Sequence, residues 1–306
     1  MISPALAENL VQILGEDRFF LDEDMGLRTS FKTGGPADAV VTPGSREEVK
    51  AVIKAIQDAG ESLFVMGNGT NLLVRDGGIR GVVMTLYDNY NDVEIEENII
   101  HAKAGALMSA VANYACRASL TGLEFSSGIP GCVGGAIRMN AGAYDGEVGD
   151  FTRAVEILDK DGNIVMRDRE AMGFGYRTST VTPEEIVLSV DFELGEGDTQ
   201  KIRAKMVDYS KRRKAKQPLN MPSAGSAFKR PEGHYAGKLI EDAGLKGYSI
   251  GGAQVSKKHA GFIINTGKAT SKDIEDLITY VRDTVYEKSG VMMESEIKIV
   301  GEPLDA

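Results

Sequence analysis

Apolar residues recur along the chain with two spacings, one typical of helices and the other typical of strands. In REEVKAVIKAIQDAG, residues 46–60, apolar side chains recur at i, i+3, i+4 and i+7, which predicts a helix that ends at Gly60. The apolar face of that helix consists of Val49, Val52, Ile53 and Ile56. The next segment, SLFVM, predicts a buried strand, and NLLV and GVVMTL predict two more.

A second helix and two hairpins follow before residue 200. The segment LMSAVANYACRAS predicts a helix with these residues on one face: Leu107, Val111, Tyr114, Ala115 and Ala118. DVEIEENIIHAKAG predicts a hairpin, and RAVEILDKDGNIVMRDRE predicts another that turns at Asp161 and Gly162. This order of strands, helices and loops indicates an α+β unit that extends to about residue 200.

The pattern changes near residue 200 and indicates a further unit. DTQKIRAKMVDYSKRRKAKQP predicts a basic helix that ends before Pro218 and joins the two parts of the chain. AGKLIEDAG and SKDIEDLITYVRDTVYEKSG then predict helices, and AGFIIN and SEIKIVG predict strands. The longer helix begins with the [ST]-x-x-[DE] pattern from Thr270 to Asp273, and Gly290 is its expected C-cap.

Composition and charge exclude several classes of protein. The 306 residues carry a formal net charge of −10, which argues against general nucleic-acid binding, because that function needs a broad basic surface. No apolar run approaches the roughly 18–20 residues of a membrane span, and the N-terminal segment lacks the basic leader of a secretion signal, so we expect a cytoplasmic protein. Cys116 and Cys132 form no CxxC pair, and no metal-ligand spacing is present, so we expect structural thiols and no metal.

The segment VMGNGTNLLVRDGG, residues 65–78, resembles a phosphate-binding loop but fits neither common nucleotide motif. It lacks the GK[ST] ending of a Walker loop and the third glycine of a dinucleotide-binding fingerprint. Gly67 and Gly69 permit positive φ, so successive N–H groups can face an anion, with Asn68, Thr70 and Asn71 as further donors. A simple turn between strands is the alternative interpretation of this loop.

Two further glycine-rich segments favour a ligand. SSGIPGCVGGAIRMNAGAYDG, residues 126–146, holds more glycines than a turn needs, and TSFKTGGPAD adds Gly34 and Gly35. A flat, extended cofactor requires such loops, because side chains would obstruct a backbone that follows a ring system and a pyrophosphate.

Six motifs, in order, make the chain resemble the UDP-N-acetylenolpyruvoylglucosamine reductase family, in its shorter form. They are FKTGGPAD, GNGTNLLVRDGGIRG, GIPGCVGGAIRMNAGAY, GYRTS, AGSAFKRP and ESEIKIVG. The resemblance runs from about residue 29 onward and implies an α+β protein with the vanillyl-alcohol-oxidase-like FAD-binding fold. It implies two α+β FAD-binding subdomains, residues 1–92 and 93–200, and a C-terminal α+β substrate domain, residues 201–306.

The resemblance also implies non-covalent FAD and NADPH as cofactors. The FAD pyrophosphate is expected over residues 67–71 and the ring system near residues 128–141. The cofactor-binding residues implied in this way are Gly34, Gly35, Gly67, Asn68, Gly69, Thr70, Asn71, Gly128, Ile129, Pro130, Gly131, Gly134, Gly135, Asn140 and Ala141.

The reaction implied by the resemblance passes a hydride from NADPH to FAD and then to the enolpyruvyl double bond of a UDP-sugar. Such an addition builds an enolate-like charge on the substrate carboxylate, so it needs a cation, a second polar group and a proton donor. Arg177, Glu296 and Ser226 lie in matching motifs and fill these roles in that order. Taken one at a time, each is more often a surface cation, a solvated carboxylate or a turn residue.

Four residues are implied as substrate neighbours: Tyr176, Lys216, Lys229 and His259. Lys216 lies in the basic run KRRKAKQP, which is ordinarily a solvated helix end but equally suits a diphosphate. Arg230 stands where the family often has asparagine, and the chain lacks the C-terminal insertion of the longer form. Those departures put one substrate contact and the covering of the UDP group in doubt.

Two other functions remain open from the sequence. One is a different FAD oxidoreductase of the same fold that acts on a hydroxy acid or an alcohol; the other is a flavin- or nucleotide-sugar-binding protein without catalysis. The combination of Arg177, Ser226 and Glu296 argues against both. No obligate protein partner is expected, and the expected partners are the UDP-sugar and NADPH.

Overall fold

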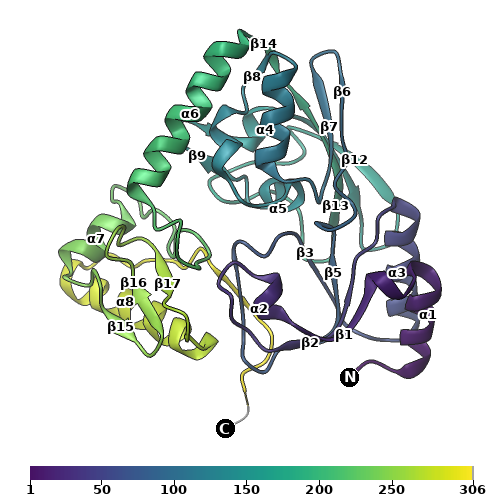
Figure 1. Cartoon of the computed structure of the whole chain (residues 1–306), viewed down its shortest axis with the longest axis horizontal. Helices are drawn as coiled ribbons and strands as arrows, with labels where there is room; N and C mark the ends of the chain where they lie inside the picture. Colours follow the sequence, from purple (N-terminus) through teal and green to yellow (C-terminus); the bar gives the residue numbers. More distant parts are fainter. Residues whose placement is uncertain (305–306) are drawn as a thin grey trace.

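The computed structural model describes residues 1–304 as three units arranged in a triangle (Figure 1). The first unit is a four-stranded sheet in the order β1-β2-β5-β3, in which β2 and β3 run parallel to β5 and β1 is antiparallel to β2. The strands are β1 (Phe19–Asp24), β2 (Pro36–Val41), β3 (Leu63–Met66) and β5 (Ile79–Thr85). The helices are α1 (Pro4–Leu14), α2 (Met25–Arg28) and α3 (Arg46–Asp58).

Helix α3 is the first helix that the hydrophobic pattern predicts, and the structure confirms it. The side chain of Ser45 accepts a hydrogen bond from the Glu48 N–H and caps the start of the helix. The predicted apolar face turns inward, with Val49, Val52 and Ile56 buried against α1 and the sheet.

The second unit is an antiparallel sheet in the order β12-β11-β13-β7-β6, with α4 (Met108–Arg117) and α5 (Val133–Arg138) packed on it. Its strands are β6 (Val93–Glu96), β7 (Ile99–Lys103), β11 (Thr152–Leu158), β12 (Ile164–Asp168) and β13 (Ile186–Glu193). Both predicted hairpins are confirmed, as β6–β7 and β11–β12. Two small ribbons complete the unit: β8 (Leu120–Thr121) with β14 (Gly195–Glu196), and β9 (Gly142–Ala143) with β10 (Gly146–Glu147).

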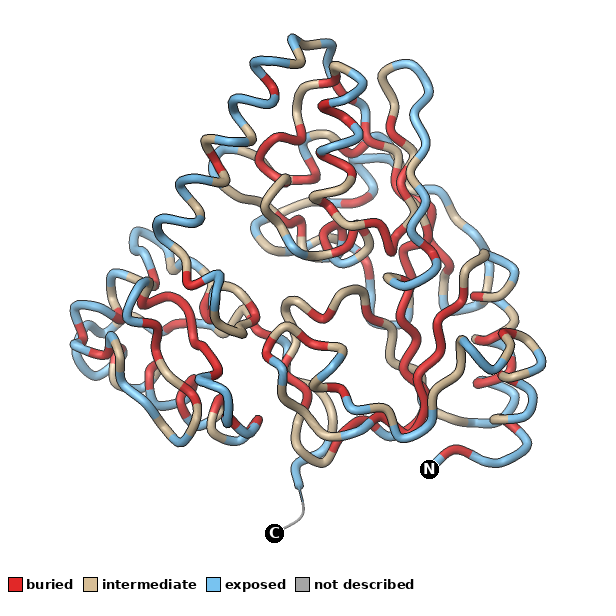
Figure 2. Tube along the Cα trace, in the orientation of Figure 1, coloured by how far each residue is buried: buried red, intermediate tan, exposed pale blue. Residues whose placement is uncertain are grey.

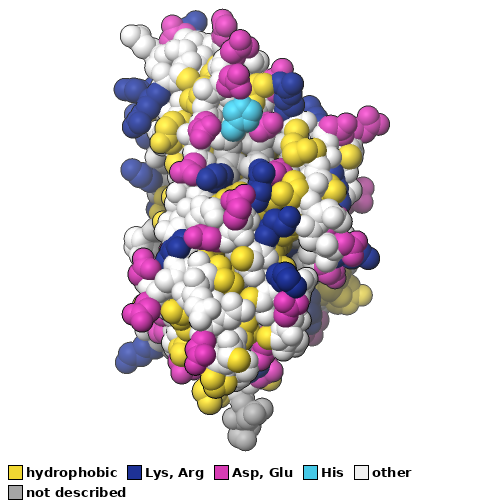
Figure 3. Space-filling view, turned by 90° about the vertical axis from the view of Figure 1, so that its right-hand side faces the viewer, with side chains coloured by type: hydrophobic (Ala, Val, Ile, Leu, Met, Phe, Trp, Pro, Cys, Tyr) yellow, Lys and Arg dark blue, Asp and Glu magenta, His cyan; other side chains and the backbone are white. Residues whose placement is uncertain are grey.

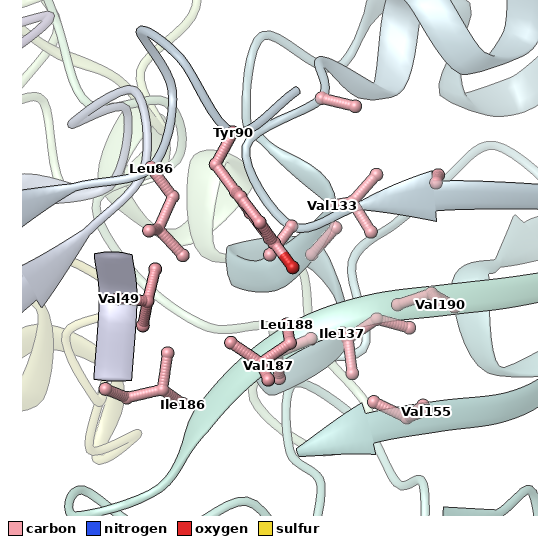
Figure 4. Packing of buried hydrophobic residues seen from close by; sticks show 14 of the residues in the cluster. Val49, Leu86, Tyr90, Val133, Ile137, Val155, Ile186, Val187, Leu188 and Val190 are labelled. Carbon is pink, nitrogen blue, oxygen red and sulfur yellow. The ribbon is translucent and has the colours of Figure 1, made fainter. Parts of the chain in front are cut away.

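One hydrophobic core joins these first two units. Figure 4 shows Val49 of α3 and Leu86 facing Ile186 and Leu188 of β13, with Tyr90 beside them. The burial map shows the same result, since buried segments continue from one sheet into the other (Figure 2). The two units therefore share this core, and the first unit has a second, smaller cluster of its own that includes Met25, Val40 and Val83.

Helix α6 (Thr199–Lys216) crosses from the second unit to the third (Figure 1). Asp198 caps its start, and only Ile202 and Tyr209 of the helix are buried. The third unit contains α7 (Ala236–Asp242), β15 (Ser249–Ile250), β16 (Ala253–Val255), β17 (Ile263–Asn265) and α8 (Ser271–Ser289). Helix α8 starts with the predicted capping box of Thr270 and Asp273 and ends at Gly290 with φ +71°, so both of its predicted ends are confirmed.

The third unit is attached mainly to the first. Its last strand, β18 (Lys298–Val300), pairs in parallel with β4 (Leu72–Val74), which follows the first glycine loop. Arg75 forms a two-pronged ion pair with Glu275, and the Asp76 carboxylate accepts hydrogen bonds from backbone N–H groups at the start of α8. The side chains of Phe31 and Leu73 belong to the core of the third unit, so the two units are closely joined.

The surface carries mixed charge. On the face shown in Figure 3, acidic and basic side chains are interspersed, with hydrophobic side chains in small groups between them. Within residues 1–304, no helix combines the length and the apolar character that crossing a bilayer demands. Cys116 and Cys132 are both buried free thiols.

Candidate active site

A cavity of about 1040 Å³ lies where the three units meet. It is open at one side and has the size of a site for a large ligand. Of the residues that the sequence singled out, these line it: Gly67, Asn68, Thr70, Asn71, Gly128, Ile129, Pro130, Ala141, Arg177, Lys216, Ser226, His259 and Glu296.

The loop between β3 and β4 forms one wall with its backbone. Gly69 has φ +58°, and a Cβ at this position would lie 2.3 Å from the Arg28 carbonyl oxygen, so the chain can turn here only with glycine. The Asn68 N–H lies against the Cys132 thiol, whereas within residues 1–304 the N–H groups of Gly69 and Thr70 donate no backbone hydrogen bond. Successive uncommitted N–H groups at a cavity wall are what a pyrophosphate needs, so this loop fits the implied FAD.

The second glycine loop lies beside the first. The Asn68 Nδ2 donates to the Pro130 carbonyl at 3.0 Å and joins the two loops. A Cβ on Gly131 would lie 3.2 Å from Thr70 Oγ1, and a Cβ on Gly128 would lie 2.9 Å from an Arg213 guanidinium nitrogen. A side chain at Gly131 would press on Thr70, and one at Gly128 would displace the end of the Arg213 side chain, so both changes would alter the shape of the cavity.

Several predicted cofactor residues are not among those that line this cavity. Gly34 and Gly35 line a smaller cavity of about 380 Å³, and a Cβ on Gly35 would lie 2.1 Å from the Asp76 carbonyl oxygen. A Cβ on Gly134 would lie 3.0 Å from the Ala104 Cβ, whereas one on Gly135 would meet nothing within 4 Å.

Asn140 is also set back from the cavity, and hydrogen bonds occupy its buried side-chain amide. Its Nδ2 donates to Glu147 Oε2 and the Gly175 carbonyl, and its Oδ1 accepts from the Gly149 N–H. These bonds fix the position of the loop that contains Ala141, which does line the cavity.

Arg177 projects from a strained two-residue turn. Gly175 and Thr178 exchange backbone hydrogen bonds of 3.1 and 3.2 Å, which leaves Tyr176 and Arg177 at the tip. Arg177 has φ +55°, a left-handed conformation that costs a non-glycine residue about 1–2 kcal/mol. Strain of this kind is typical of functional sites, where the surroundings must hold the residue in place.

Glu296 meets Arg177 across the boundary between the second and third units. Arg177 Nε donates to Glu296 Oε1 at 3.0 Å, and Arg177 Nη2 donates to the Gly142 carbonyl at 3.1 Å. Burial raises the pKa of Glu296, and this effect outweighs the lowering by Arg177 and Lys229. The Glu296 carboxyl is therefore easier to protonate than an exposed glutamate, even next to an arginine.

Ser226 lies on the same side of the cavity. It forms a backbone bridge with Phe262, and the Glu296 N–H donates to the carbonyl of the next residue, Ala227, at 2.9 Å. Ser226 is exposed to the cavity, so a ligand can reach its hydroxyl. The structure thus brings together the three residues that the sequence selected for catalysis.

The four predicted substrate neighbours divide into two pairs. Lys216 and His259 line the cavity, and burial lowers the pKa of His259. Tyr176 and Lys229 do not line it. The Lys229 ammonium pairs with Glu294, and the Tyr176 hydroxyl accepts a hydrogen bond from the Arg230 N–H.

The sequence analysis did not single out Arg213 or the Tyr144–Tyr209 pair, which also line the cavity. Arg213 donates to the neutral Gln217 side chain, and burial lowers the pKa of Arg213. The two tyrosine rings stack with centroids 4.2 Å apart, and Tyr144 Oη donates to the Tyr209 carbonyl. Arg213 could have been found from its i, i+3 spacing to Lys216 on a predicted helix; the tyrosine pairing has no local signal.

Positive charge is concentrated at the cavity, although the chain as a whole is acidic. Arg212, Arg213 and Lys216, from the last turns of α6, all line it. A cluster of cations inside a chain of net charge −10 favours an anionic ligand at this place.

Comparisons with known proteins agree with this geometry. Residues 37–166 match the family described as FAD binding domain, and residues 217–300 match UDP-N-acetylenolpyruvoylglucosamine reductase, C-terminal domain. The chain is 53% identical to the UDP-N-acetylenolpyruvoylglucosamine reductase of Caldanaerobacter subterraneus subsp. tengcongensis over 97% of this chain and 98% of that protein. It is 48% identical to the same enzyme of Clostridioides difficile over 96% of this chain and 97% of that protein.

Solved structures support the fold. The crystal structure of UDP-N-acetylenolpyruvylglucosamine reductase from Thermus caldophilus superposes with a TM-score of 0.79 at 37% identity, covering 92% of this chain and 97% of that one. The 4-ethylphenol oxidase from Gulosibacter chungangensis superposes with a TM-score of 0.50 at 16% identity, covering 96% of this chain and 66% of that one, and this likeness bears on the fold alone. The predicted α+β fold, a vanillyl-alcohol-oxidase-like FAD-binding fold with an added C-terminal domain, is confirmed.

Proposed function

The chain belongs to the UDP-N-acetylenolpyruvoylglucosamine reductase family, and from this we propose how its cavity carries out the family's reaction. The enzyme reduces the enolpyruvyl group of UDP-N-acetylglucosamine enolpyruvate to the lactyl ether of UDP-N-acetylmuramate, a precursor of peptidoglycan. It is a flavoprotein that uses FAD and NADPH. The observation that carries our assignment of roles is the Arg177–Glu296 contact of 3.0 Å beside Ser226, opposite a wall of uncommitted N–H groups.

Residues 67–71 and 128–131 would hold FAD, with Ala141 at the edge of the same wall. The uncommitted N–H groups suit its pyrophosphate, and the glycines leave space for a flat ring system. Gly34, Gly35, Gly134 and Asn140 would shape the loops that carry this wall, and the exposed Gly135 would leave open space beside it. When bound, FAD accepts a hydride from NADPH and supplies one to the substrate's methylene carbon.

Arg177 and Glu296 would bind the substrate carboxylate. As the methylene carbon gains a hydride, the π electrons of the double bond move toward the carboxylate and build an enolate. The planar guanidinium of Arg177 stabilises that charge, and Glu296 in its protonated form donates a hydrogen bond to it. The raised pKa of Glu296 supports the protonated form.

Ser226 would complete the reduction as the proton donor. Its hydroxyl gives a proton to the substrate's α carbon, the enolate electrons form the new C–H bond, and the serine oxygen regains a proton from solvent. Because Ser226 is exposed to the cavity, water can reach it between turnovers.

Lys216 would bind the UDP diphosphate, since it extends the basic end of α6 into the cavity. His259 would contact the substrate from the loop between β16 and β17. Lys229 does not line the cavity, so it would act on the substrate indirectly, through its ion pair with Glu294. The Arg230 side chain, which stands where the family often has asparagine, lies over the Tyr235 ring at 4.1 Å. We place the enzyme in the cytoplasm, where UDP-sugars and NADPH are made, with no obligate protein partner.

A visible absorption spectrum of the purified protein tests this proposal. We expect a flavin band that bleaches with NADPH under anaerobic conditions and returns when UDP-N-acetylglucosamine enolpyruvate is added. A band that bleaches and does not return would favour another FAD oxidoreductase of this fold. A colourless protein that cannot be reconstituted with FAD would contradict the assignment of the glycine loops.

A further inference from the structure

Tyr176 is adjacent to the catalytic arginine but lies outside the cavity lining. Its hydroxyl accepts a hydrogen bond of 3.0 Å from the Arg230 backbone N–H, which belongs to the third unit. Its ring lies under the Arg177 guanidinium, with the Arg177 Cζ 5.1 Å from the ring centroid. One side chain therefore touches both the catalytic cation and the neighbouring unit.

The turn that holds Arg177 needs such support. Arg177 occupies a left-handed conformation at φ +55°, which favours glycine, so the turn does not hold this shape by local preference alone. Two hydrogen bonds hold its guanidinium, to Glu296 and to the Gly142 carbonyl. A substrate carboxylate that enters between Arg177 and Glu296 weakens the first of these bonds at the moment when the arginine must be in place.

The contact between Tyr176 and residue 230 would persist through that change, because it uses neither Glu296 nor the Arg177 guanidinium. The partner is a backbone N–H, and the Arg230 side chain points away, with its Nε donating to the His234 carbonyl at 3.3 Å. The contact thus depends on the path of the backbone in the third unit and not on which side chain stands at position 230.

We propose that Tyr176 is a positioning residue for the enolate-stabilising step: it holds the strained turn of Arg177 against the third unit while Glu296 is engaged with the substrate. In this role it acts through Arg177. This inference rests on the function proposed above.

Tyr176→Phe is the first variant, because it keeps the ring under Arg177 and removes only the hydroxyl. We expect the substrate-driven return of the flavin band to slow about threefold to tenfold, as the loss of one hydrogen bond that acts in the transition state predicts. NADPH-driven bleaching, FAD content and the dissociation constant of the oxidised enzyme for the UDP-sugar, measured by calorimetry, should stay within twofold of wild type. Arg230→Ala is the matched control, since it retains the backbone N–H and should leave the reoxidation rate unchanged.

Two double variants test whether Tyr176→Phe acts through its hydrogen bond to residue 230 and through Arg177. Arg230→Pro removes the same hydrogen bond from the donor side, so adding Tyr176→Phe to it should cause no further loss. In an Arg177→Ala background, Tyr176→Phe should likewise change nothing. A merely structural role would lower the melting temperature and both half-reactions together, and this would overturn the inference, as would full additivity with Arg177→Ala or a wild-type reoxidation rate in Tyr176→Phe.

The same experiment separates this inference from the function on which it rests. If the wild-type flavin band does not return with the UDP-sugar, the proposed function fails. If it returns equally fast in wild type and in Tyr176→Phe, only the role of Tyr176 fails.

Discussion

The two walls of the cavity are built in opposite ways. The cofactor wall, residues 67–71 and 128–131, presents backbone N–H groups and space left by missing side chains. The substrate wall presents the side chains of Arg177, Ser226 and Glu296. Members of the cofactor wall come from two short loops, whereas Arg177 and Glu296, which touch, are 119 positions apart in the sequence.

This difference indicates that cofactor binding relies on backbone groups, whereas catalysis relies on side chains. A backbone wall can hold a cofactor that every turnover needs in the same place, because main-chain groups are fixed by strands and turns. Charge that develops only in the transition state needs side chains with the right ionisation, and these come from separate units. Changes in the two walls should therefore affect different half-reactions.

The largest effect is expected for Ser226→Ala on the substrate wall. Removing the proton donor should slow substrate-driven reoxidation by about 10²–10⁴-fold, because the variant lacks the hydroxyl that protonates the α carbon. FAD content and NADPH-driven bleaching should remain nearly normal in stopped-flow measurements. An equal loss in both half-reactions would mean that Ser226 is not the proton donor and that the walls are not functionally separate.

Arg177→Lys should come next, with a loss of about 10²-fold in the same half-reaction. Lysine keeps the positive charge but cannot reproduce the planar fork that contacts Glu296 and the Gly142 carbonyl. Single-turnover rates with saturating substrate measure this loss. Turnover near that of wild type would show that charge alone suffices on this wall.

Glu296→Gln tests whether the carboxyl works in its neutral form. The amide keeps a neutral donor, so we expect a loss of only about tenfold, equivalent to about 1.4 kcal/mol, and a reoxidation rate that no longer falls as pH rises. In wild type it should fall above the raised pKa of Glu296, where the proton is lost.

The stability of the folded protein should change with pH in the same direction as the reoxidation rate. Because burial raises the pKa of Glu296 in the folded state, its contribution is full below the ordinary carboxyl pKa and is lost as pH rises through the raised value. Melting temperatures of wild type and Glu296→Gln across that range provide the check. A steeper pH dependence in the variant would contradict the protonated role.

Two glycine variants test the cofactor wall, with smaller effects. A Cβ on Gly67 would lie 3.0 Å from the Cys132 Cβ, so Gly67→Ala should weaken FAD retention by about tenfold through a shift of the loop costing about 1–3 kcal/mol. Gly135→Ala is the control, since its Cβ would meet nothing within 4 Å. On helix α5 we expect it to stabilise the protein by up to about 1 kcal/mol and to leave FAD affinity unchanged; a lower affinity would place Gly135 against the cofactor.

The sequence predicted the cofactor wall better than the substrate wall for a physical reason. Gly67, Gly69 and Gly128 indicate tight backbone turns from the local sequence alone. The capping box of α8 is also a local pattern, so a short segment suffices to predict both features. The Arg177–Glu296 contact depends on how two units pack, and the individual residues give no sign of it. Only the order of the six motifs connected them.

Some features could not be predicted from any short segment. The pairing of β18 with β4 joins residues more than two hundred positions apart, and hydrophobic periodicity carries no information on partner strands. The left-handed conformation of Arg177 was missed as well, because arginine does not favour it and only the surroundings impose it. The close packing of the Gly34 and Gly35 backbone against Val74 and Asp76 was not predicted either.

The pairing of β18 with β4 also orders events while the protein is being made. A chain that grows from its N-terminus completes both glycine loops long before Glu296 and β18 leave the ribosome, and early segments fold first. Strand β4, which directly follows the first glycine loop, therefore gains its partner strand only after the C-terminal segment has been made. The loop that is expected to hold the flavin pyrophosphate reaches its final form only when β18, which is made much later, pairs beside it.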